Sequence, residues 1–269
     1  MTGANMAEKN VLIVVPIYQQ ELSEIERLSL TYSLAKLPSR DVVFVGPQGL
    51  PMDYYAFHFP GIALRCFDAA YFKSVATYSH LLLRPDFYSS FQEYEFILIL
   101  QTDAIVLRDD LNHWVNQSFD YVGAPWPGGW KLKINVARFA GENEKLISVD
   151  VGNGGLSLRR ISGVLSLLNH FSDVAAVAID RKMAEDMFYG ISGVLADGFR
   201  VPDALTASRF AMEFDPQDMF VLNGAVYPMG GHSWWEKDPQ FWLPLIDETF
   251  RDQFQKLIPV PTQNTSRNT

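Results

Sequence analysis

The chain has a single cysteine, Cys66, among its 269 residues. One thiol excludes an intrachain disulfide framework and any zinc site built from several cysteines, and it is compatible with a reducing compartment. Because a free cysteine usually behaves as a small apolar side chain, we expect Cys66 to be buried.

Long apolar runs and an excess of positive charge are also missing. No apolar run approaches roughly 18 residues, and the polar residues 1–10 lack the apolar centre of a signal peptide. We therefore expect a soluble cytoplasmic protein; a loose attachment to the cytoplasmic membrane face through a partner or a lipid substrate stays open. The formal net charge of −9 argues against a general nucleic-acid binder.

The sequence is rich enough in apolar residues for a large core, at 48% hydrophobic and 13% aromatic. We expect a flexible N-terminus at 1–10 and one domain at 11–261. Within that domain, residues 11–125 and 126–261 would form two halves. The polar tail at 262–269 is expected to be disordered.

The beginning of the chain has the pattern of a βαβ unit. An apolar run at 11–15 ends at Pro16 and predicts a buried strand of a parallel sheet. Ser23 and Glu26 fit a capping box that opens a helix, and residues 41–46 predict the next strand. The fold class is therefore α/β, with a mostly parallel central sheet flanked by helices.

Later elements follow from the same patterns. Short strands are expected at 64–67, 96–100, 120–126, 156–159 and 211–214, with helices at 73–83, 161–171 and from 185 onward. Residues 127–144 contain Gly128, Gly129 and Trp130 and are expected to form a long loop or lid. Residues 230–235 are expected to form a turn from glycines to aromatic side chains.

Asp103 is the most informative residue, because it is the one acidic residue at the end of an otherwise apolar strand. Desolvating an unpaired carboxylate is costly, so Asp103 should lie at the open end of the strand, where ligands bind in α/β sheets. A hard cation such as Mg²⁺ or Mn²⁺ would suit this oxygen ligand. Alternatively, Asp103 caps the following turn, with Arg108 as its partner.

Glycines and paired carboxylates mark two further candidate sites. Residues 152–155, Gly-Asn-Gly-Gly, allow the backbone to approach a substrate closely, although they would equally suit a tight turn entering a strand. Glu185 and Asp186 are adjacent carboxylates at a helix start. One of them could face a cleft as a general base, or both could stabilise the helix N-terminus.

His232 precedes two tryptophans, Trp234 and Trp235. A neutral imidazole can bind a divalent ion, and indole faces suit sugar stacking. The alternative is a structural histidine beside two core tryptophans.

Taken in order, four blocks resemble a family of GT-A-like glycosyltransferases known mainly as a domain of unknown function. They are Gln-Thr-Asp-Ala at 101–104, Gly-Ala-Pro-Trp at 123–126, Gly-Asn-Gly-Gly at 152–155 and Glu-Asp at 185–186. The resemblance extends over about residues 11–235, and the blocks are specific only when taken together.

The resemblance implies a metal site and a base. In the GT-A superfamily an Asp-x-Asp motif holds the metal and diphosphate, a downstream Glu-Asp supplies the base in many inverting members, and a late His completes the metal shell. Asp103 and His232 would correspond to the ligands of Mn²⁺ or Mg²⁺, and Asp186 to the base. The pattern departs at Gln101, which replaces the first Asp.

The resemblance also implies that residues 11–125 form the nucleotide-binding half and residues 126–261 the acceptor-side half, and it implies binding residues in each half. Those for the nucleotide or donor are Pro16, Ile17, Tyr18, Lys73, Ser74, Tyr78, Gln101, Thr102 and Asp103. Those for the acceptor or the transferred sugar are Trp126, Asn153, Gly154, Gly155, Glu185 and Trp234, with the two tryptophans as stacking platforms. Glu26 is a further candidate, although its capping box already explains it.

The implied function is transfer of a sugar from a nucleotide-sugar donor, expected to be UDP-linked, to a glycan or glycolipid, as in polysaccharide biosynthesis. Inversion by single displacement is expected; retention stays open if Asp186 is not the base. One alternative is a non-catalytic sugar- or nucleotide-binding relic, which Gln101 would fit. Another is a nucleotidyltransferase, although no phosphate loop with glycine and lysine follows the first strand.

Overall fold

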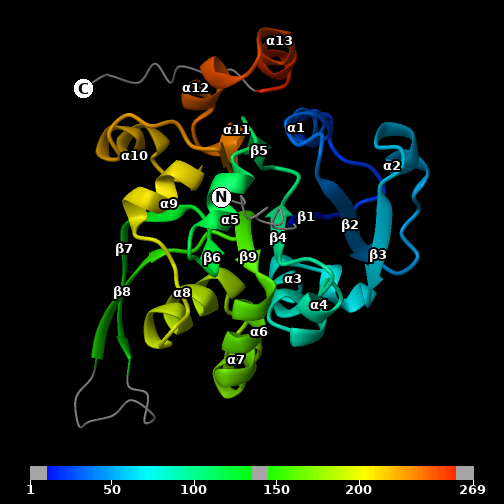
Figure 1. The fold of residues 1–269 in the computed structure, drawn as a ribbon. Helices are drawn as coiled ribbons and strands as arrows, with labels where there is room; N and C mark the ends of the chain where they lie inside the picture. Colours follow the sequence, from blue (N-terminus) through cyan, green and yellow to red (C-terminus); the bar gives the residue numbers. More distant parts are fainter. Residues whose placement is uncertain (1–10, 135–144, 259–269) are drawn as a thin grey trace, which may run out of the picture.

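The computed structural model describes residues 11–134 and 145–258 (Figure 1). Its centre is a six-stranded sheet whose order is β3 (Ala63–Phe67), β2 (Asp41–Pro47), β1 (Val11–Pro16), β4 (Phe96–Leu100), β9 (Leu156–Arg160) and β6 (Tyr121–Val122). Strands β1 to β4 are parallel, whereas β9 runs antiparallel to both of its neighbours. The predicted mostly parallel α/β sheet is confirmed.

Two smaller sheets accompany the central one. The first has the order β10 (Ala211–Met212), β11 (Gly230–Gly231) and β5 (Ile105–Val106). The second is a hairpin of β7 (Pro125–Ile134) and β8 (Lys145–Val151), which projects away from the central sheet in Figure 1.

Helices pack against both faces of the central sheet. The longer ones are α1 (Glu24–Ala35), α3 (Val75–Leu82), α6 (Ile161–His170), α7 (Ser172–Asp180), α8 (Glu185–Leu195) and α13 (Glu248–Leu257). The shorter ones are α2 (Asp53–His58), η1 (Ala69–Phe72), α4 (Pro85–Ser89), α5 (Leu111–Asn116), α9 (Ala204–Phe210), α10 (Pro216–Leu222), α11 (Trp234–Lys237), α12 (Pro239–Trp242) and η2 (Leu243–Leu245).

The apolar character of β4 follows from burial on both of its faces. Phe96, Leu98 and Leu100 pack into one core cluster, and Ile97 and Ile99 pack into the cluster on the opposite face. A strand that is covered on both faces has no solvated side chain, which favours apolar residues along its whole length. The polar side chains of this segment therefore follow β4, in the turn at 101–103.

The expected lid is wrong for residues 127–134, which form part of β7 and pair with β8. Leu132 packs with Ile147 and Val149 in a small apolar cluster. Gly128 and Gly129 have positive φ angles of 75° and 65°, at an irregularity in the pairing. The glycines hid the strand pattern because they interrupt the alternation of side chains. The expected lid residues 135–144 lie outside the described residues.

Three further expectations concern the start of α1, the ends of the chain and the division of the domain into halves. The capping box is confirmed, since the Glu26 backbone N–H donates to Ser23 Oγ at 3.4 Å and the Ser23 backbone N–H donates to Glu26 Oε2 at 3.0 Å. The expected flexible ends at 1–10 and 262–269 lie outside the described residues. The division into two halves stays a prediction, and β9 of the second half lies inside the central sheet.

Among the described helices, no single one is long and apolar enough to cross a membrane. Helices α6 and α7 reach the required length and composition only as a pair, and they are bent by 83° relative to each other. Apolar side chains of both helices pack into a core cluster of the protein.

The expectation that Cys66 is buried is wrong. Cys66 lies on β3, at the edge of the central sheet, and its side chain is exposed. An edge strand has no neighbour on one side, so its residues are more accessible than those of a central strand.

The exposure of Cys66 predicts its reactivity. The native protein should react with one equivalent of a thiol reagent at a rate that unfolding in urea raises by less than about tenfold, because an exposed thiol needs no opening of the fold. Absorbance of the released thiolate follows the reaction, and Cys66→Ser is the blank. Protection that is lost only on unfolding would contradict the exposed position.

Candidate active site

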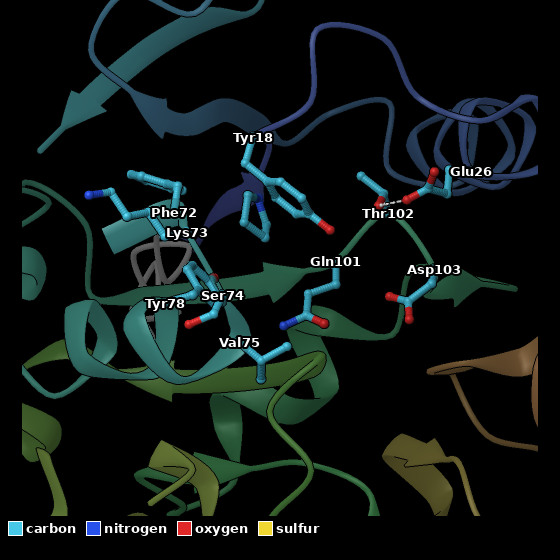
Figure 2. Close-up of a pocket in the computed structure, with 11 residues that line it drawn as sticks. Tyr18, Glu26, Phe72, Lys73, Ser74, Val75, Tyr78, Gln101, Thr102 and Asp103 are labelled. Carbon is cyan, nitrogen blue, oxygen red and sulfur yellow. Dashed lines mark hydrogen bonds between the residues drawn. The ribbon is translucent and has the colours of Figure 1, made fainter. Parts of the chain in front are cut away.

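A pocket of about 450 Å³ lies beyond the carboxyl ends of β1 and β4 (Figure 2). The predicted donor-binding residues that line it are Pro16, Tyr18, Lys73, Ser74, Tyr78, Gln101, Thr102 and Asp103. Glu26, Phe72 and Val75 complete the lining. The structure thus brings together residues from four separate segments at the edge where α/β proteins bind ligands.

Ile17 does not share this arrangement. Its side chain is 1% exposed and belongs to the core, and its backbone N–H donates to the Val45 carbonyl at 2.8 Å. Ile17 is therefore not among the residues that line this pocket, because its side chain is packed in the core, and this corrects the expectation that it lines the nucleotide site.

Glu26 has two roles at the pocket wall. Besides capping α1, it accepts a hydrogen bond through Oε1 from Thr102 Oγ1 at 2.8 Å (Figure 2). This contact fixes the turn after β4 against the start of α1. The capping box therefore uses Oε2 of Glu26, whereas Oε1 holds the turn at Thr102.

Two buried polar groups at the predicted site have no hydrogen-bond partner among the described residues. They are the Tyr78 hydroxyl, in the pocket, and Asn153 Nδ2. Burial raises the pKa of Tyr78, so its hydroxyl stays protonated near neutral pH. Asn153 also has a positive φ of 39°. A buried donor without a partner costs free energy, and a ligand oxygen would offset that cost.

His232 forms the centre of a polar cluster beside the pocket. Its Nε2 lies 3.1 Å from Gln101 Oε1 and 3.2 Å from Asp103 Oδ1, while its Nδ1 lies 2.9 Å from Glu213 Oε2. The Ser233 hydroxyl donates to Asp103 Oδ2 at 3.4 Å. The predicted pair Asp103 and His232 is thus in direct contact, with a carboxylate on each side of the imidazole.

Burial and the neighbouring carboxylates act in opposite directions on the imidazole of His232. Burial is the largest single influence and favours the neutral ring, but the hydrogen bonds and negative charges of Asp103 and Glu213 together outweigh it and raise the pKa of His232 to about 10. Burial also disfavours the Asp103 carboxylate, yet His232 and Ser233 together lower the pKa of Asp103. Since a metal ligand must be a neutral imidazole, cation binding at Nε2 would release a proton.

The donor set fits a divalent cation. Among the described residues, no group of three or more His, Cys, Asp or Glu side chains forms a metal cluster. The set here consists of a carboxylate, an imidazole nitrogen and an amide oxygen, from Asp103, His232 and Gln101. Oxygen ligands suit Mg²⁺ and Mn²⁺, imidazole is an accepted ligand, and open positions remain for phosphate oxygens and water.

The glycine block connects this cluster to the two carboxylates at the start of α8. The Gly155 carbonyl accepts from the Gln101 backbone N–H at 2.9 Å, and a Cβ at Gly155 would overlap the His232 ring. A Cβ at Gly154 would lie 2.5 Å from Glu185 Oε1. The glycines are therefore needed for close packing between the pocket side and the α8 side of the site.

Asp186 lies in the first turn of α8 and is partly buried. Burial and the neighbouring charge of Glu185 raise the pKa of Asp186 to about 6, against backbone hydrogen bonds from Met187 and Gly154 that lower it. The Met187 N–H donates to Asp186 Oδ1 at 2.7 Å. A carboxylate with this pKa is ionised near neutral pH and basic enough to accept a proton.

Glu185 has a structural environment rather than the expected contact with an acceptor. It is buried and forms an ion pair with Arg159 at 3.0 Å, and it accepts from Ser79 Oγ at 2.9 Å. Arg159 is fully buried and also donates to Tyr88 Oη at 2.9 Å and Ser157 Oγ at 3.0 Å. The expected acceptor contact of Glu185 is replaced by this internal pairing, which occupies both carboxylate oxygens.

Neither predicted stacking tryptophan presents an open ring. Trp234 is fully buried, and its indole N–H donates to Ser29 Oγ at 3.0 Å. Trp126 is 8% exposed, and its ring covers Gly152 so closely that a Cβ there would overlap it. Both residues are core side chains in this structure, which corrects the expected stacking platforms.

A family model described as "Protein of unknown function (DUF5672)" matches residues 61–232. The chain belongs to this family. The matched range contains all four sequence blocks and His232, so the predicted family resemblance is confirmed. No curated protein matches the chain.

Solved glycosyltransferases share the fold. A crystal structure of the galactosyltransferase LgtC with donor and acceptor sugar analogs is similar at a TM-score of 0.52 and 15% identity, covering 93% of this chain and 97% of that one. An active-site Gln-to-Glu mutant of LgtC gives 0.52 and 14%, with the same coverage. The apo bifunctional glycosyltransferase WbbM gives 0.52 and 11%, covering 95% of this chain and 50% of that one. The chain therefore has the GT-A glycosyltransferase fold.

Sequence reasoning missed Glu213 and Arg159. Glu213 stands in the apolar run 210–214 and shows the same signal that marked Asp103, one acidic residue at the end of an apolar strand. Arg159 alternates with Leu156 and Leu158, a pattern that suggests a solvated face. That reading fails because β9 lies between two other strands and is covered on both faces.

The Arg159–Glu185 pair predicts a large effect on stability. Arg159→Met should lower the free energy of unfolding by about 3–5 kcal/mol, because it leaves the Glu185 carboxylate buried without its partner. Urea denaturation measures the change. The matched control is Arg84→Met in the exposed pair Arg84–Asp86, which should cost about 1 kcal/mol or less. Equal effects of the two variants would contradict the structural role of the buried pair.

Proposed function

We propose that this protein is a glycosyltransferase that moves a sugar from a nucleotide-sugar donor to a saccharide or glycoconjugate acceptor. The observation that carries the proposal is that three features lie together: the pocket, the Asp103–His232 contact and the Asp186 carboxylate. Gly154 and Gly155 are packed between them. The glycosyltransferase fold of LgtC and WbbM supports it.

The donor would occupy the pocket of Figure 2. Tyr18 presents an exposed ring near the end of β1, where it can cover a nucleotide base beside Pro16. Lys73 supplies a positive charge at the rim, and the Tyr78 hydroxyl supplies a free donor. These groups suit a base at one end of the pocket and a diphosphate that extends toward Asp103.

Asp103 and His232, with Gln101 beside them, would hold a divalent cation, Mn²⁺ or Mg²⁺. When bound, the cation stabilises the negative charge that develops on the nucleoside diphosphate leaving group. Asp103 and His232 orient the diphosphate end of the donor at the mouth of the pocket.

Asp186 would act as the general base. The carboxylate accepts the proton of the acceptor hydroxyl while that oxygen attacks the anomeric carbon, and the nucleoside diphosphate leaves from the opposite face. Glu185 does not contact substrate; its negative charge keeps Asp186 basic. The sugar site would lie between the Asp103–His232 contact and Asp186. It would be shaped by the Gly154–Gly155 backbone and by Asn153, whose buried amide nitrogen has no hydrogen-bond partner among the described residues.

The experiment that tests the function is a screen of sugar nucleotides for slow hydrolysis in the presence of Mn²⁺, beginning with UDP-sugars. Release of nucleoside diphosphate from one donor, dependent on Asp186, would support a transferase. Nucleotide-dependent thermal stabilisation without any hydrolysis or transfer would indicate the non-catalytic relic. The anomeric configuration of the product then distinguishes inversion from retention.

Asp186→Asn should lower kcat by about 10²–10⁴-fold, because the amide cannot accept the acceptor proton. For the wild type, kcat/KM should rise with pH through about 6 and level off above it, since only the ionised carboxylate of Asp186 is a base. Steady-state rates across pH 5–8 check both expectations. Turnover by Asp186→Asn near the wild-type rate would rule out Asp186 as the base.

Stability measurements separate this effect from unfolding. The pKa of Asp186 is raised in the folded state, so its contribution to stability is complete below the ordinary Asp pKa and is lost as pH rises through about 6. Asparagine does not ionise, so Asp186→Asn avoids this loss of stability. The variant should be at least as stable as the wild type at pH 7–8. A thermal melt at each pH provides the control.

Asp103→Ala should weaken Mn²⁺-dependent binding of UDP by at least about tenfold, because it removes the carboxylate from the proposed ligand set of Asp103, His232 and Gln101. Calorimetric titration with and without Mn²⁺ measures the change. Asp252→Ala, at an exposed carboxylate on α13, is the matched control and should bind as the wild type does. A metal response that is unchanged in Asp103→Ala would defeat this assignment.

A further inference from the structure

Glu213 is a buried carboxylate that the proposed mechanism leaves without a role. It follows β10 directly, its side chain is 6% exposed, and its Oε2 lies 2.9 Å from His232 Nδ1. A carboxylate withdrawn from water needs a charged or hydrogen-bonding partner. His232 supplies that partner, so both nitrogens of the imidazole are held by side chains of this chain.

The backbone of the small sheet sets this contact. Strands β10 and β11 are parallel, with Met212 paired to Gly231, so the residues that follow on the two strands are Glu213 and His232. The His232 N–H donates to the Met212 carbonyl at 3.2 Å. Strand β11 is also antiparallel to β5, which begins just after Asp103. One three-stranded sheet therefore places Asp103, His232 and Glu213 at the same edge.

We propose that Glu213 is a positioning residue for the cation site: it accepts a hydrogen bond from His232 Nδ1–H and so directs Nε2 toward the cation. This role rests on the proposed function. The hydrogen bond at one ring nitrogen determines which tautomer is present and fixes the ring plane, leaving the other nitrogen as the ligand.

Glu213 acts through His232 and not as a ligand. The two ring nitrogens of an imidazole face in different directions, and Glu213 Oε2 lies on the Nδ1 side. Asp103 and Gln101 lie on the Nε2 side, at 3.2 and 3.1 Å. The cation would occupy the Nε2 side, separated from Glu213 by the ring.

Direct titration with Mn²⁺ tests the role without relying on activity. Electron paramagnetic resonance of free Mn²⁺, recorded on the full chain without nucleotide, gives the affinity. Glu213→Ala should lower it by about 10- to 100-fold, because the ring loses its orientation. Glu213→Gln keeps an acceptor oxygen but not the charge, so its affinity should lie between that of Glu213→Ala and that of the wild type.

Glu236→Gln, at an exposed glutamate on α11, is the matched control and should bind Mn²⁺ as the wild type does. Thermal melts of all variants report folding, and the near-isosteric Glu213→Gln carries the test if Glu213→Ala does not fold. Wild-type Mn²⁺ affinity in Glu213→Gln and in any folded Glu213→Ala, with only the melting temperature changed, would show a structural role and overturn the proposal.

Two further outcomes separate this inference from the function on which it rests. If His232→Ala binds Mn²⁺ as the wild type does, or if the wild type does not bind Mn²⁺, two roles are overturned together: that of His232 as a ligand and that of Glu213 as its positioning residue. The transferase proposal is then judged by the donor-hydrolysis screen alone. Donor hydrolysis together with unaffected Glu213 variants would overturn only the inference about Glu213.

Discussion

The buried ion pair of Arg159 with Glu185 is the constraint on which the arrangement of the site depends. Arg159 comes from the central sheet and Glu185 from the first turn of α8, and both are withdrawn from water. Two charges in a protein interior are tolerated only when their geometry and hydrogen bonds are nearly complete. The pair therefore fixes α8 against β9 within narrow limits. Asp186, the next residue, takes its position from that attachment, and its burial together with the charge of Glu185 raises its pKa.

The site is assembled where two sheets meet. The central sheet ends at the turn that carries Gln101 and Asp103, and the small β10–β11–β5 sheet brings His232 to the same turn. Glycines make this meeting possible, since a Cβ at Gly155 would overlap the His232 ring and a Cβ at Gly154 would approach Glu185. A shift of either sheet would separate the side-chain atoms of Gln101, Asp103 and His232 that now lie about 3 Å apart, so packing far from the pocket determines the geometry of this cluster.

The sequence predicted the parts of the site that local pattern determines. Asp103 could be singled out because a lone acidic residue at the end of an apolar strand lies where ligands bind in α/β sheets, with a turn cap as the alternative. Trp234 could not be placed, because a buried and a sugar-stacking tryptophan look alike until Ser29 and the surrounding helices are in position. The same holds for Glu185: its partner Arg159 is 26 residues away, and only the tertiary fold shows that the two meet. Local patterns predict elements and strand ends, whereas pairing across the fold depends on packing.

Charge balance bears on the meaning of Gln101. Replacing the first Asp of the motif removes one carboxylate from the ligand side of the site, yet Glu213 adds one on the far side of His232. Because the pKa of His232 is raised to about 10, a protonated imidazole holds one positive charge between the Asp103 and Glu213 carboxylates. A divalent ion at Nε2 would take the place of that proton, so the same two carboxylates could balance either charge. In both cases Glu213 offsets the carboxylate that Gln101 lacks.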